Sequence, residues 1–378
     1  MKNKIKVLHT IRQGKIGGGE THVINLIEQL NSEHFESLLL AFTEGPMVDK
    51  MRARGIKTYV LKTEKPFDFT KWGQVEKILV DNKIDIVHAH GTRASSNSFY
   101  AARKCGIPLI YTVHGWSFHP DQSFFVKKIR LLSESQLIKK SDFTICVSNN
   151  NLLDGRSHFK IAKAKVIRSG IDLEKFNYRL TVSDLRGEFG IGERDILVGY
   201  VVRITKQKDP FTLIKAISLI PVDLKIKFLF VGEGDLKDQS IALAKQLKVH
   251  DRIIFTPFRE DVPAVLKAID IYCLPSLWEG LPIGLLEAMA MKKAVIATAI
   301  DGTKEVIEHM ENGILVPVSS PQILADSIMM LAGNVELLSS LGANALETIK
   351  RDYDNERMTK QIENIYSELS RRNGHLKL

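Results

Sequence analysis

The feature that most constrains this chain is a regular alternation of short β-branched runs with longer amphipathic stretches. The amphipathic stretches include ETHVINLIEQLN, KWGQVEKILVDN and DQSIALAKQLKV. The short runs are KVLHT, SLLLAF, KTYVL, DIVHAH, PLIYTVH, FTICVS, AKVIRSG, DILVGYV, IKFLFVG, RIIFTP, IDIYCLP, AVIAT and GILVPV. Strands of about four to seven residues alternating with helices of about ten or more are typical of parallel βαβ units. A parallel sheet is covered on both faces, which explains why these strands are apolar throughout.

The pattern and the length together predict an α/β fold with two doubly wound, Rossmann-like domains. A chain of 378 residues is too long for one ordinary core of this kind. The turn-rich stretch SGIDLEKFNYR at 169–179 separates the two sets of runs. We therefore expect an N-terminal domain at 1–176, completed by a C-terminal helix at 352–378 that crosses back, and a second domain at 177–351. Ligands bind beyond the carboxyl ends of parallel strands, so two facing sheets would form a central cleft.

The composition is that of a soluble globular protein, with 44% apolar and 26% charged residues. The N-terminus has too short an apolar run for a signal peptide, and no later stretch reaches about 18 uninterrupted apolar residues. We therefore expect a cytoplasmic protein, with peripheral attachment to the inner face of the cell membrane as an alternative. The three scattered cysteines, Cys105, Cys146 and Cys273, are expected to be reduced structural residues.

Positive charge is concentrated in the first half of the chain. Residues 1–180 carry 29 Lys and Arg against 17 Asp and Glu, whereas residues 181–378 carry 24 against 27. A basic surface suits phosphorylated substrates or anionic lipids, and without a nucleic-acid-binding motif we expect no nucleic-acid partner. The segment 121–140 could lie on an anionic membrane, or it could pack its apolar face against its own domain. Its apolar and basic side chains are Phe124, Phe125, Lys127, Lys128, Ile129, Arg130 and Leu132.

A glycine-rich turn, Gly17, Gly18 and Gly19, follows the first strand and precedes a helix. Glycine lets the backbone approach a ligand, and the N-terminus of a helix offers free N–H groups to a phosphate. The spacing is not G-x-G-x-x-G, and no acid lies at the usual ribose distance, so the pattern does not favour a nicotinamide dinucleotide. The alternative is a tight turn without a ligand.

The segment PSLWEGLPIGLLEAMAMKKAVIAT contains two carboxylates, Glu279 and Glu287. Pro282 fits the first turn of a helix, and eight helical residues rise about 12 Å, comparable to the distance between the sugar and the ribose of a nucleotide sugar. The free N–H groups of the helix would face the diphosphate. Arg203 and Lys208 follow another strand, where cations could stabilise a departing nucleoside diphosphate. Taken singly, each acid could cap the helix or lie on the surface, and each cation could be a solvated surface residue.

Together these motifs resemble the retaining GT-B glycosyltransferases of family 4 (group 1), which serve bacterial polysaccharide and cell-envelope biosynthesis. The resemblance covers most of 165–350 and is thinner before it, where it rests on GGGE at 17–20, VHAHG at 87–91 and TVHGW at 112–116. Its other motifs are R-x4-K at Arg203–Lys208, VGEGD at 231–235, RIIFTPFREDVPAVL at 252–266, E-x7-E at Glu279–Glu287, DGTKEVI at 301–307 and NGILVPV at 312–318. The sequence departs from the family at Ser169 and Phe258, where Asn and Gly are commoner.

The resemblance implies a role for each matched residue. Arg203 and Lys208 would bind the diphosphate, Glu279 the donor sugar and Glu287 the ribose. His114 would face the reacting centre, and the glycines at 17–19 would lie beside the diphosphate or the acceptor. The remaining residues of the expected donor site are Phe258 and Arg259 near the base, and Gly280, Leu281, Ile283, Gly284 and Leu285 between the two carboxylates.

No metal ion or other cofactor is predicted. The sequence lacks an HExxH or comparable spacing, and His88 and His90 are expected to be structural. Asp352 and Asp354 form a D-x-D, the motif that other glycosyltransferases use for a metal, but they precede the terminal helix and are expected to cap it. Arg203, Lys208 and helix N–H groups would take the place of a cation.

We therefore expect retaining transfer of a hexose or N-acetylhexosamine from a nucleotide diphosphate sugar, with a UDP-sugar favoured. The expected acceptor is a lipid-linked saccharide in capsule, O-antigen or exopolysaccharide synthesis, and a small soluble acceptor is the alternative. Two other classes fit the architecture: a nucleotide-sugar epimerase, with acid and base on both faces of the sugar, and a non-catalytic scaffold. The pairing of R-x4-K with E-x7-E favours the transferase.

Overall fold

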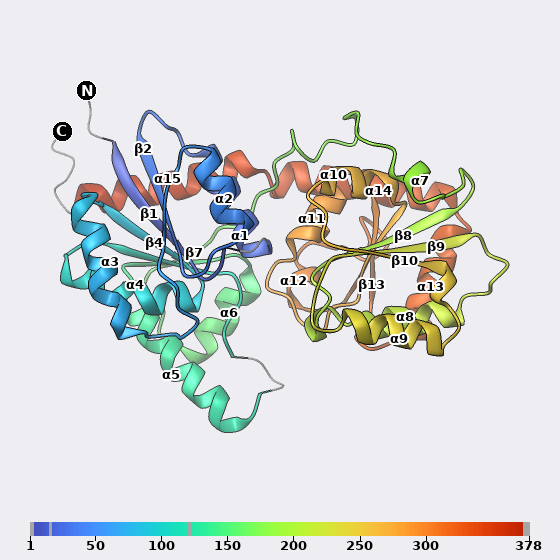
Figure 1. The fold of residues 1–378 in the computed structure, drawn as a ribbon, viewed down its shortest axis with the longest axis horizontal. Coiled ribbons are helices and arrows are strands. Elements are labelled where there is room, and N and C mark those ends of the chain that lie inside the picture. The colour runs from blue at the N-terminus through green and yellow to red at the C-terminus, as the bar shows by residue number, and fades with distance from the viewer. Residues whose placement is uncertain (1–3, 15–16, 119–121, 373–378) are drawn as a thin grey trace. The chain divides into compact units, whose positions relative to one another are not determined.

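The computed structural model describes residues 4–14, 17–118 and 122–372 (Figure 1). The chain forms two compact units: unit 1 is Met1–Gly170 with Asn355–Leu378, and unit 2 is Ile171–Asp354. The sequence predicts borders at 176 and 352, a few residues from those of the structure. Each unit is an α/β domain built on one parallel sheet, as expected, and each of the predicted runs contains a strand.

Unit 1 is built on a seven-stranded sheet in the order β3-β2-β1-β4-β5-β6-β7. Its strands are β1 (Ile5–Ile11), β2 (Phe35–Ala41), β3 (Lys57–Val60), β4 (Ile86–His90), β5 (Leu109–Val113), β6 (Phe143–Cys146) and β7 (Ala164–Val166). Its helices are α1 (Gly18–Gln29), α2 (Pro46–Ala53), α3 (Phe69–Asp81), α4 (Thr92–Lys104), α5 (Phe124–Lys140), α6 (Asn149–His158) and α15 (Asn355–Arg372). The strand order reverses between β1 and β4, which pair in parallel.

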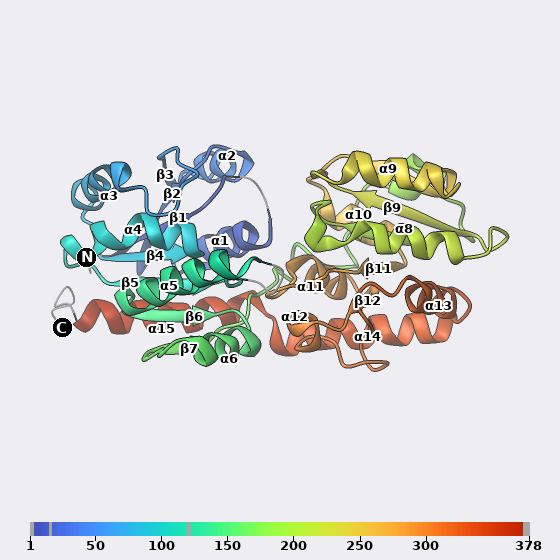
Figure 2. The ribbon, with the colours of Figure 1, turned by 90° about the horizontal axis from the view of Figure 1, so that it is seen from below.

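The terminal helix α15 is an integral part of unit 1, and Figure 2 shows it running alongside the sheet. Met358, Ile362 and Tyr366 of α15 are buried in one apolar cluster with residues of β1, β4 and β5, among them Val7. The apolar residues of α15 recur at helical spacing, so one face of the helix covers the sheet. The chain therefore returns to its first domain after completing the second one.

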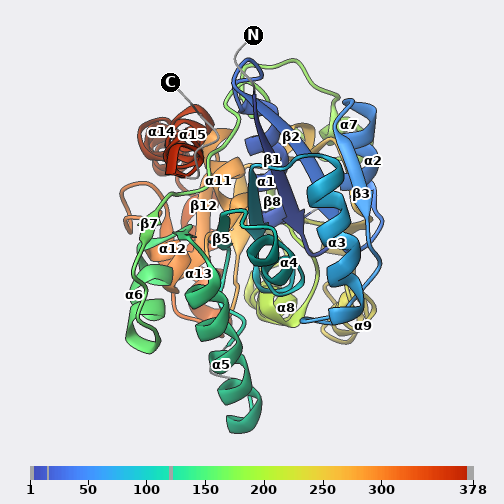
Figure 3. The same cartoon turned by 90° about the vertical axis from the view of Figure 1, so that its left-hand side faces the viewer.

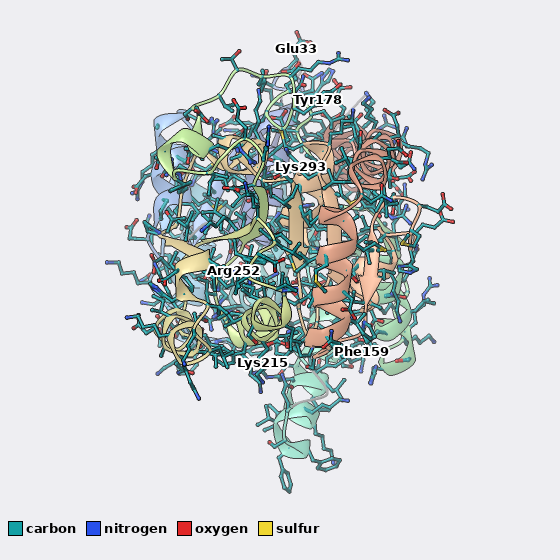
Figure 4. All side chains as sticks on the ribbon, turned by 90° about the vertical axis from the view of Figure 1, so that its right-hand side faces the viewer. Glu33, Phe159, Tyr178, Lys215, Arg252 and Lys293 are labelled. Carbon is teal, nitrogen blue, oxygen red and sulfur yellow. The ribbon has the colours of Figure 1, made fainter. Side chains whose placement is uncertain are left out.

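Unit 2 is built on a six-stranded sheet in the order β10-β9-β8-β11-β12-β13. Its strands are β8 (Ile196–Val201), β9 (Ile226–Val231), β10 (Ile253–Thr256), β11 (Ile271–Leu274), β12 (Ala294–Thr298) and β13 (Ile314–Val316). Its helices are α7 (Leu185–Glu188), η1 (Lys206–Lys208), α8 (Pro210–Leu219), α9 (Lys237–Gln246), η2 (His250–Arg252), α10 (Val262–Ala268), α11 (Ile283–Ala290), α12 (Asp301–Lys304), α13 (Pro321–Ala332) and α14 (Val335–Asp352). Arg252, labelled in Figure 4, ties η2 to the end of α8 by donating to the carbonyl oxygen of Ile220 at 2.7 Å.

Among the described residues, no single helix is both long and apolar enough to cross a membrane. One bent pair, α13 and α14, passes that test by length and composition only, and its two helices meet at an angle of 101°. The three cysteines are free thiols, of which Cys146 and Cys273 are buried.

Candidate functional site

The two loops of unit 2 that carry the predicted catalytic residues follow neighbouring strands. β8 leads into Arg203 and Lys208, and β11 leads into Glu279. β8 pairs directly with β11, and the strand order of the sheet reverses at this point. In open α/β sheets, ligands bind beyond the carboxyl ends of the strands at such a reversal, so this end of the sheet is the expected position for a ligand. Arg203 is exposed, whereas Lys208 and Glu279 are half-buried.

Lys208 and Glu279 form an ion pair, with their side chains 19% and 6% exposed. Ser276 Oγ donates to the same oxygen, Glu279 Oε1, at 2.7 Å. Gln207 Nε2 donates to the other oxygen, Oε2, at 3.4 Å and to the carbonyl oxygen of Trp278 at 2.9 Å. Since both carboxylate oxygens accept hydrogen bonds, Glu279 is held in one orientation.

The backbone of Lys208 is fixed from two sides. Its carbonyl oxygen accepts a hydrogen bond of 3.0 Å from the buried Tyr200 hydroxyl. The next residue, Asp209, has φ +46°, a left-handed conformation that Asp tolerates better than most residues. From there its carboxylate caps α8 by accepting from the N–H and the hydroxyl of Thr212, at 3.2 and 2.6 Å. The turn η1 therefore ends with Lys208 directed at Glu279.

Two glycines let neighbouring loops touch the backbone of this site. A Cβ at Gly302 would lie 2.2 Å from the carbonyl oxygen of Gly280, directly after Glu279. A Cβ at Gly234 would lie 2.0 Å from the carbonyl oxygen of Ile204, in the loop of Arg203. Contacts of this length exclude any side chain, so the segments VGEGD and DGTKEVI, the second of which begins with α12, can support the site only with glycine at these positions.

The helix between the two carboxylates begins later than the sequence predicts. Pro282 is the N-cap of α11, and the helix starts at Ile283. Residues 279–282 are therefore loop, so the two carboxylates are not joined by eight helical residues. Leu281, Ile283 and Leu285 are buried. Their side chains are therefore part of the protein interior.

Glu287 lies in the second turn of α11 and is half-buried. Burial raises the pKa of its carboxyl group to about 7, and the charge of Lys175 opposes this rise. Burial, followed by the charges of Glu287 and Glu279, raises the pKa of Tyr272 well above its usual value. A Cβ at Gly284 would lie 2.8 Å from the Tyr272 hydroxyl, so Tyr272 and α11 are in close contact.

The two residues predicted near the base differ in their surroundings. Phe258 is 44% exposed. Arg259 donates to both carboxylate oxygens of Asp261 at 2.8 Å and to Glu188 Oε1 at 2.8 Å. These bonds to Asp261 and then Glu188 raise the pKa of the guanidinium group further. Base binding by Arg259 stays a prediction, and its guanidinium group is engaged within unit 2.

In unit 1, the glycine-rich turn lies against the predicted catalytic histidine. Gly17 is the N-cap of α1, and Gly18 and Gly19 form its first turn, so the helix starts two residues before Glu20. A Cβ at Gly19 would lie 3.7 Å from the His114 ring, which is ordinary contact. His114 follows β5 and is half-buried. The two features are therefore adjacent.

His114 belongs to a cluster of five histidines, and sequence reasoning gave no role to two of them, His9 and His22. Neighbouring rings in the cluster lie 4.1 to 5.7 Å apart between centroids, as in the pairs His88–His90 and His9–His90. Burial lowers the pKa of His9 to about 3 and that of His114 to about 4. Burial, and then the charges of neighbouring histidines, lowers the pKa values of the other three well below the usual value. All five rings are therefore neutral at neutral pH.

The predicted structural role of His88 agrees with its surroundings, because both of its ring nitrogens lie at hydrogen-bond distance from hydroxyl groups. Asp352, of the D-x-D pair, is the last residue of α14 and pairs with Arg351. Sequence reasoning missed Gln207 and Ser276 as supports of Glu279. Both are polar residues within the motifs of Lys208 and Glu279, and this adjacency was the available signal.

Helix α5 presents a second surface of interest. Its first half is exposed, with exposed fractions of 74% at Phe124, 76% at Phe125 and 64% at Ile129. Figure 3 shows α5 projecting beyond α4 and α6, and Figure 4 shows side chains around its projecting end. Inward packing begins at Leu131 and continues through Leu137 and Ile138. The alternative that the apolar side chains Phe124, Phe125, Ile129 and Leu132 pack against their own domain is therefore wrong, because all four are exposed.

Comparisons with known proteins assign the chain to a family. A model of Glycosyltransferase Family 4 matches residues 16–175, and a model of Glycosyl transferases group 1 matches residues 182–348. The chain belongs to the group 1, family 4 glycosyltransferases. The group 1 match lies within unit 2, and the Family 4 match covers most of unit 1 and ends five residues beyond Gly170. The two matches favour the transferase over the epimerase and scaffold alternatives.

The glycosyltransferase resembles characterised relatives over nearly its whole length. It is 26% identical over 382 residues to UDP-Gal:alpha-D-GlcNAc-diphosphoundecaprenol alpha-1,3-galactosyltransferase of Escherichia coli, covering 97% of this chain and 98% of that protein. It is 25% identical over 329 residues to N-acetyl-alpha-D-glucosaminyl L-malate synthase of Bacillus anthracis, covering 85% of each.

Solved structures agree on the GT-B fold. Anabaena HepE in complex with UDP and glucose matches with a TM-score of 0.86 and 23% identity, over 96% of this chain and 100% of that chain. WaaG, a glycosyltransferase of lipopolysaccharide biosynthesis, matches with a TM-score of 0.77 and 16% identity, over 95% and 99%.

Proposed function

We propose that this glycosyltransferase moves a hexose or N-acetylhexosamine from a UDP-sugar to an acceptor hydroxyl with retention of the anomeric configuration. The proposed acceptor is a lipid-linked saccharide in surface-polysaccharide assembly. The Escherichia coli relative is named for a UDP-galactose donor and a diphosphoundecaprenol-linked acceptor, which supports both parts of this proposal. The Bacillus anthracis relative is named for a malate product, which keeps a small soluble acceptor as the second candidate.

The Lys208–Glu279 pair is the observation that carries the proposal. The leaving nucleoside diphosphate gains negative charge in the transition state, and fixed cations stabilise that charge without reorganisation. Arg203 and Lys208 would supply the cations, and the free N–H groups and positive dipole end of α11, which begins at Ile283, would add to them. Glu279, held by Lys208, Ser276 and Gln207, is a fixed acceptor for sugar hydroxyls.

Retention follows from front-face attack by the acceptor hydroxyl, on the side from which the nucleotide leaves. Glu279 is engaged by three donors, which suits a positioning acceptor better than a nucleophile. Glu287 would hold the ribose, with Phe258 and Arg259 near the base. In unit 1, His114 and the glycines at 17–19 would serve the transfer step. No metal is required, since Arg203, Lys208 and helix N–H groups provide the positive charge.

The first test incubates the pure protein with UDP-, GDP- and ADP-sugars, with and without EDTA, and measures nucleotide release. We expect release from a UDP-sugar that EDTA does not affect. Lys208→Ala and Glu279→Ala should each lower the rate about 10²–10³-fold, as expected for losing one preorganised electrostatic group. NMR of the product should show the anomeric configuration of the donor.

The matched control is Glu347→Ala, which removes an exposed carboxylate paired with Lys350 on the surface of α14. It should leave the rate unchanged. Full activity in Lys208→Ala or Glu279→Ala would refute the assigned roles. Loss of activity in EDTA, restored by Mg²⁺ or Mn²⁺, would refute metal independence, and isomerised sugar still attached to UDP would indicate an epimerase.

We further propose that the exposed half of α5 binds an anionic membrane surface, which would bring the enzyme to a lipid-linked acceptor. Phe124, Phe125 and Ile129 supply apolar area, and Lys127, Lys128 and Arg130 supply the charge that attracts anionic lipid. The second half of α5 anchors this surface through Glu134, whose carboxylate accepts hydrogen bonds from Thr92 and Tyr111, both at 2.8 Å.

Vesicle flotation tests this membrane contact. The protein should float with vesicles containing anionic lipid, less so at high salt, and Phe124→Ser/Phe125→Ser should abolish flotation. Phe69→Ser is a matched control, because Phe69 is also 74% exposed but lies at the start of α3. If the double variant floats like the wild type, or the wild type does not float, this part of the proposal fails.

A further inference from the structure

Two groups of three histidines in unit 1 have a geometry that could hold a metal ion. One ring nitrogen from each of His22, His90 and His114 lies within 4.8 Å of the others, and the same holds for His9, His88 and His90. The histidines come from β1, α1, β4 and the residue after β5, so distant parts of the chain meet here. In β1 and β4 the register pairs His9 with His88.

The hydrogen bonds distinguish the two groups. His88 is fully engaged, with Nδ1 at 2.6 Å from the Tyr366 hydroxyl and Nε2 at 2.7 Å from the Thr112 hydroxyl. A metal at His88 would have to break one of these bonds. In contrast, the buried Nε2 of His22 has no hydrogen-bond partner among the described residues. Buried polar atoms are seldom left unpartnered, so this lone nitrogen points to a missing ligand.

In the group of His22, His90 and His114, the other ring nitrogens of His22 and His90 lie at hydrogen-bond distance from neighbouring side chains. His22 Nδ1 lies 3.0 Å from the Ser169 hydroxyl. His90 Nε2 lies 3.4 Å from His9 Nδ1, and His9 Nε2 lies 3.4 Å from the Ser37 hydroxyl. One assignment of protons satisfies all three contacts, if His22 Nδ1, His90 Nε2 and His9 Nε2 each donate. That assignment leaves the lone pair of His22 Nε2 without a partner, while His90 Nδ1 accepts from His114 Nε2 at 3.4 Å, a contact that a bound metal ion would replace. The outer partners of His22 and His90 are of the kind that orient metal-binding histidines.

We propose that His22, His90 and His114 bind a divalent transition-metal ion that prefers imidazole ligands, with Zn²⁺ foremost. Tetrahedral zinc with bonds of about 2.0–2.1 Å places its nitrogen ligands about 3.4 Å apart. His90 Nδ1 and His114 Nε2 are already 3.4 Å apart, so only His22 must approach. Gly19 faces the His114 ring without a side chain. Three histidines plus an open fourth position form a common zinc set.

This site depends on the geometry of unit 1 alone and not on the proposed transfer reaction. The metal ion at this site takes no part in the proposed transfer reaction, where Arg203 and Lys208 supply the positive charge. Because His114 is proposed to serve transfer, a metal ion bound to it would compete with that role. Occupancy of the site therefore inhibits the enzyme. A chelator restores the activity of metal-loaded protein and leaves the activity of metal-free protein unchanged.

The test adds Co²⁺, a coloured substitute for Zn²⁺, to full-length protein that has been treated with EDTA and desalted. We expect one tightly bound Co²⁺ per chain, with the visible absorption of a four-coordinate ion, and its displacement by Zn²⁺. His22→Ala should lose this ion. Ser169→Ala keeps all three ligands but removes an outer partner, so it should weaken binding about 10–100-fold without abolishing it. His250→Ala changes a half-buried histidine of unit 2, outside the cluster, and is the control that should bind like the wild type.

Circular dichroism and gel filtration report whether each variant is folded, and the graded effect of Ser169→Ala provides a second measure should His22→Ala fail to fold. The proposal is overturned if the wild type retains no Co²⁺ after desalting, or if His22→Ala and Ser169→Ala bind it as tightly as the wild type. Metal binding is measured without substrate, so its failure is separate from failure of the transfer assay.

Discussion

At the scale of single residues, the site of unit 2 depends on how a few charges are buried and paired. Glu279 pairs with Lys208 and accepts a hydrogen bond from Ser276, whereas Glu287 is half-buried in α11 with a pKa raised to about 7. The two acids of one motif therefore have different surroundings. The sequence predicts both acids, but not this difference, because it arises from the packing of α11 against the core.

Glu287 should make the stability of unit 2 depend on pH. Its folded pKa of about 7 lies above the usual 4.5, so the folded state retains a proton that the unfolded chain releases. The free energy of unfolding should therefore fall by about 1–3 kcal/mol as the pH rises from about 4.5 to 7, and then level off. Glu287→Gln should remove this dependence in urea unfolding at several pH values. The exposed Glu347→Gln should not, and an unchanged pH profile in Glu287→Gln would contradict the assignment.

At the scale of elements, the parallel strands could be predicted from the sequence, because burial on both faces of a sheet leaves apolar runs of characteristic length. The first residue of α11 could not be predicted in this way, because Pro282 fits both the N-cap and the first turn of a helix. The histidine cluster could not be predicted from the sequence either. His9 and His88 are far apart in the sequence and meet through the register of β1 and β4. Pairing register is a tertiary property, which local patterns do not specify.

The anchoring of α5 by Glu134 can be tested by stability. The buried Glu134 carboxylate accepts hydrogen bonds from Thr92 and Tyr111 and, at 3.2 Å, from the N–H of Ser117. Glu134→Ala leaves these donors unpartnered in the interior and should lower the free energy of unfolding by about 2–4 kcal/mol. Thermal unfolding measures this loss. Glu76→Ala, which removes a more exposed carboxylate paired with Lys104, should cost less than about 1 kcal/mol. Equal losses in the two variants would contradict an anchoring role.

At the scale of the whole molecule, two separate cores predict separate responses to core mutations. Ile362 of α15 is fully buried in unit 1, and Ile328 of α13 is fully buried in unit 2. Ile362→Ala should destabilise unit 1 by about 2–5 kcal/mol, and Ile328→Ala should do the same to unit 2. Hydrogen exchange should accelerate in β1 and β4 for the first variant, and in β8 and β12 for the second. Faster exchange in both sheets for either variant would show that the two cores unfold together.

The position of α15 also bears on the order in which a ribosome can complete the two domains. Residues 1–170 emerge first, but their sheet lacks the apolar cover that Met358, Ile362 and Tyr366 provide. Unit 2 is continuous in sequence and can fold as soon as it is synthesised. At about 5–20 residues per second, its synthesis takes on the order of 10–40 s, during which the nascent N-terminal domain stays incomplete. In this chain the domain that is made first is finished last.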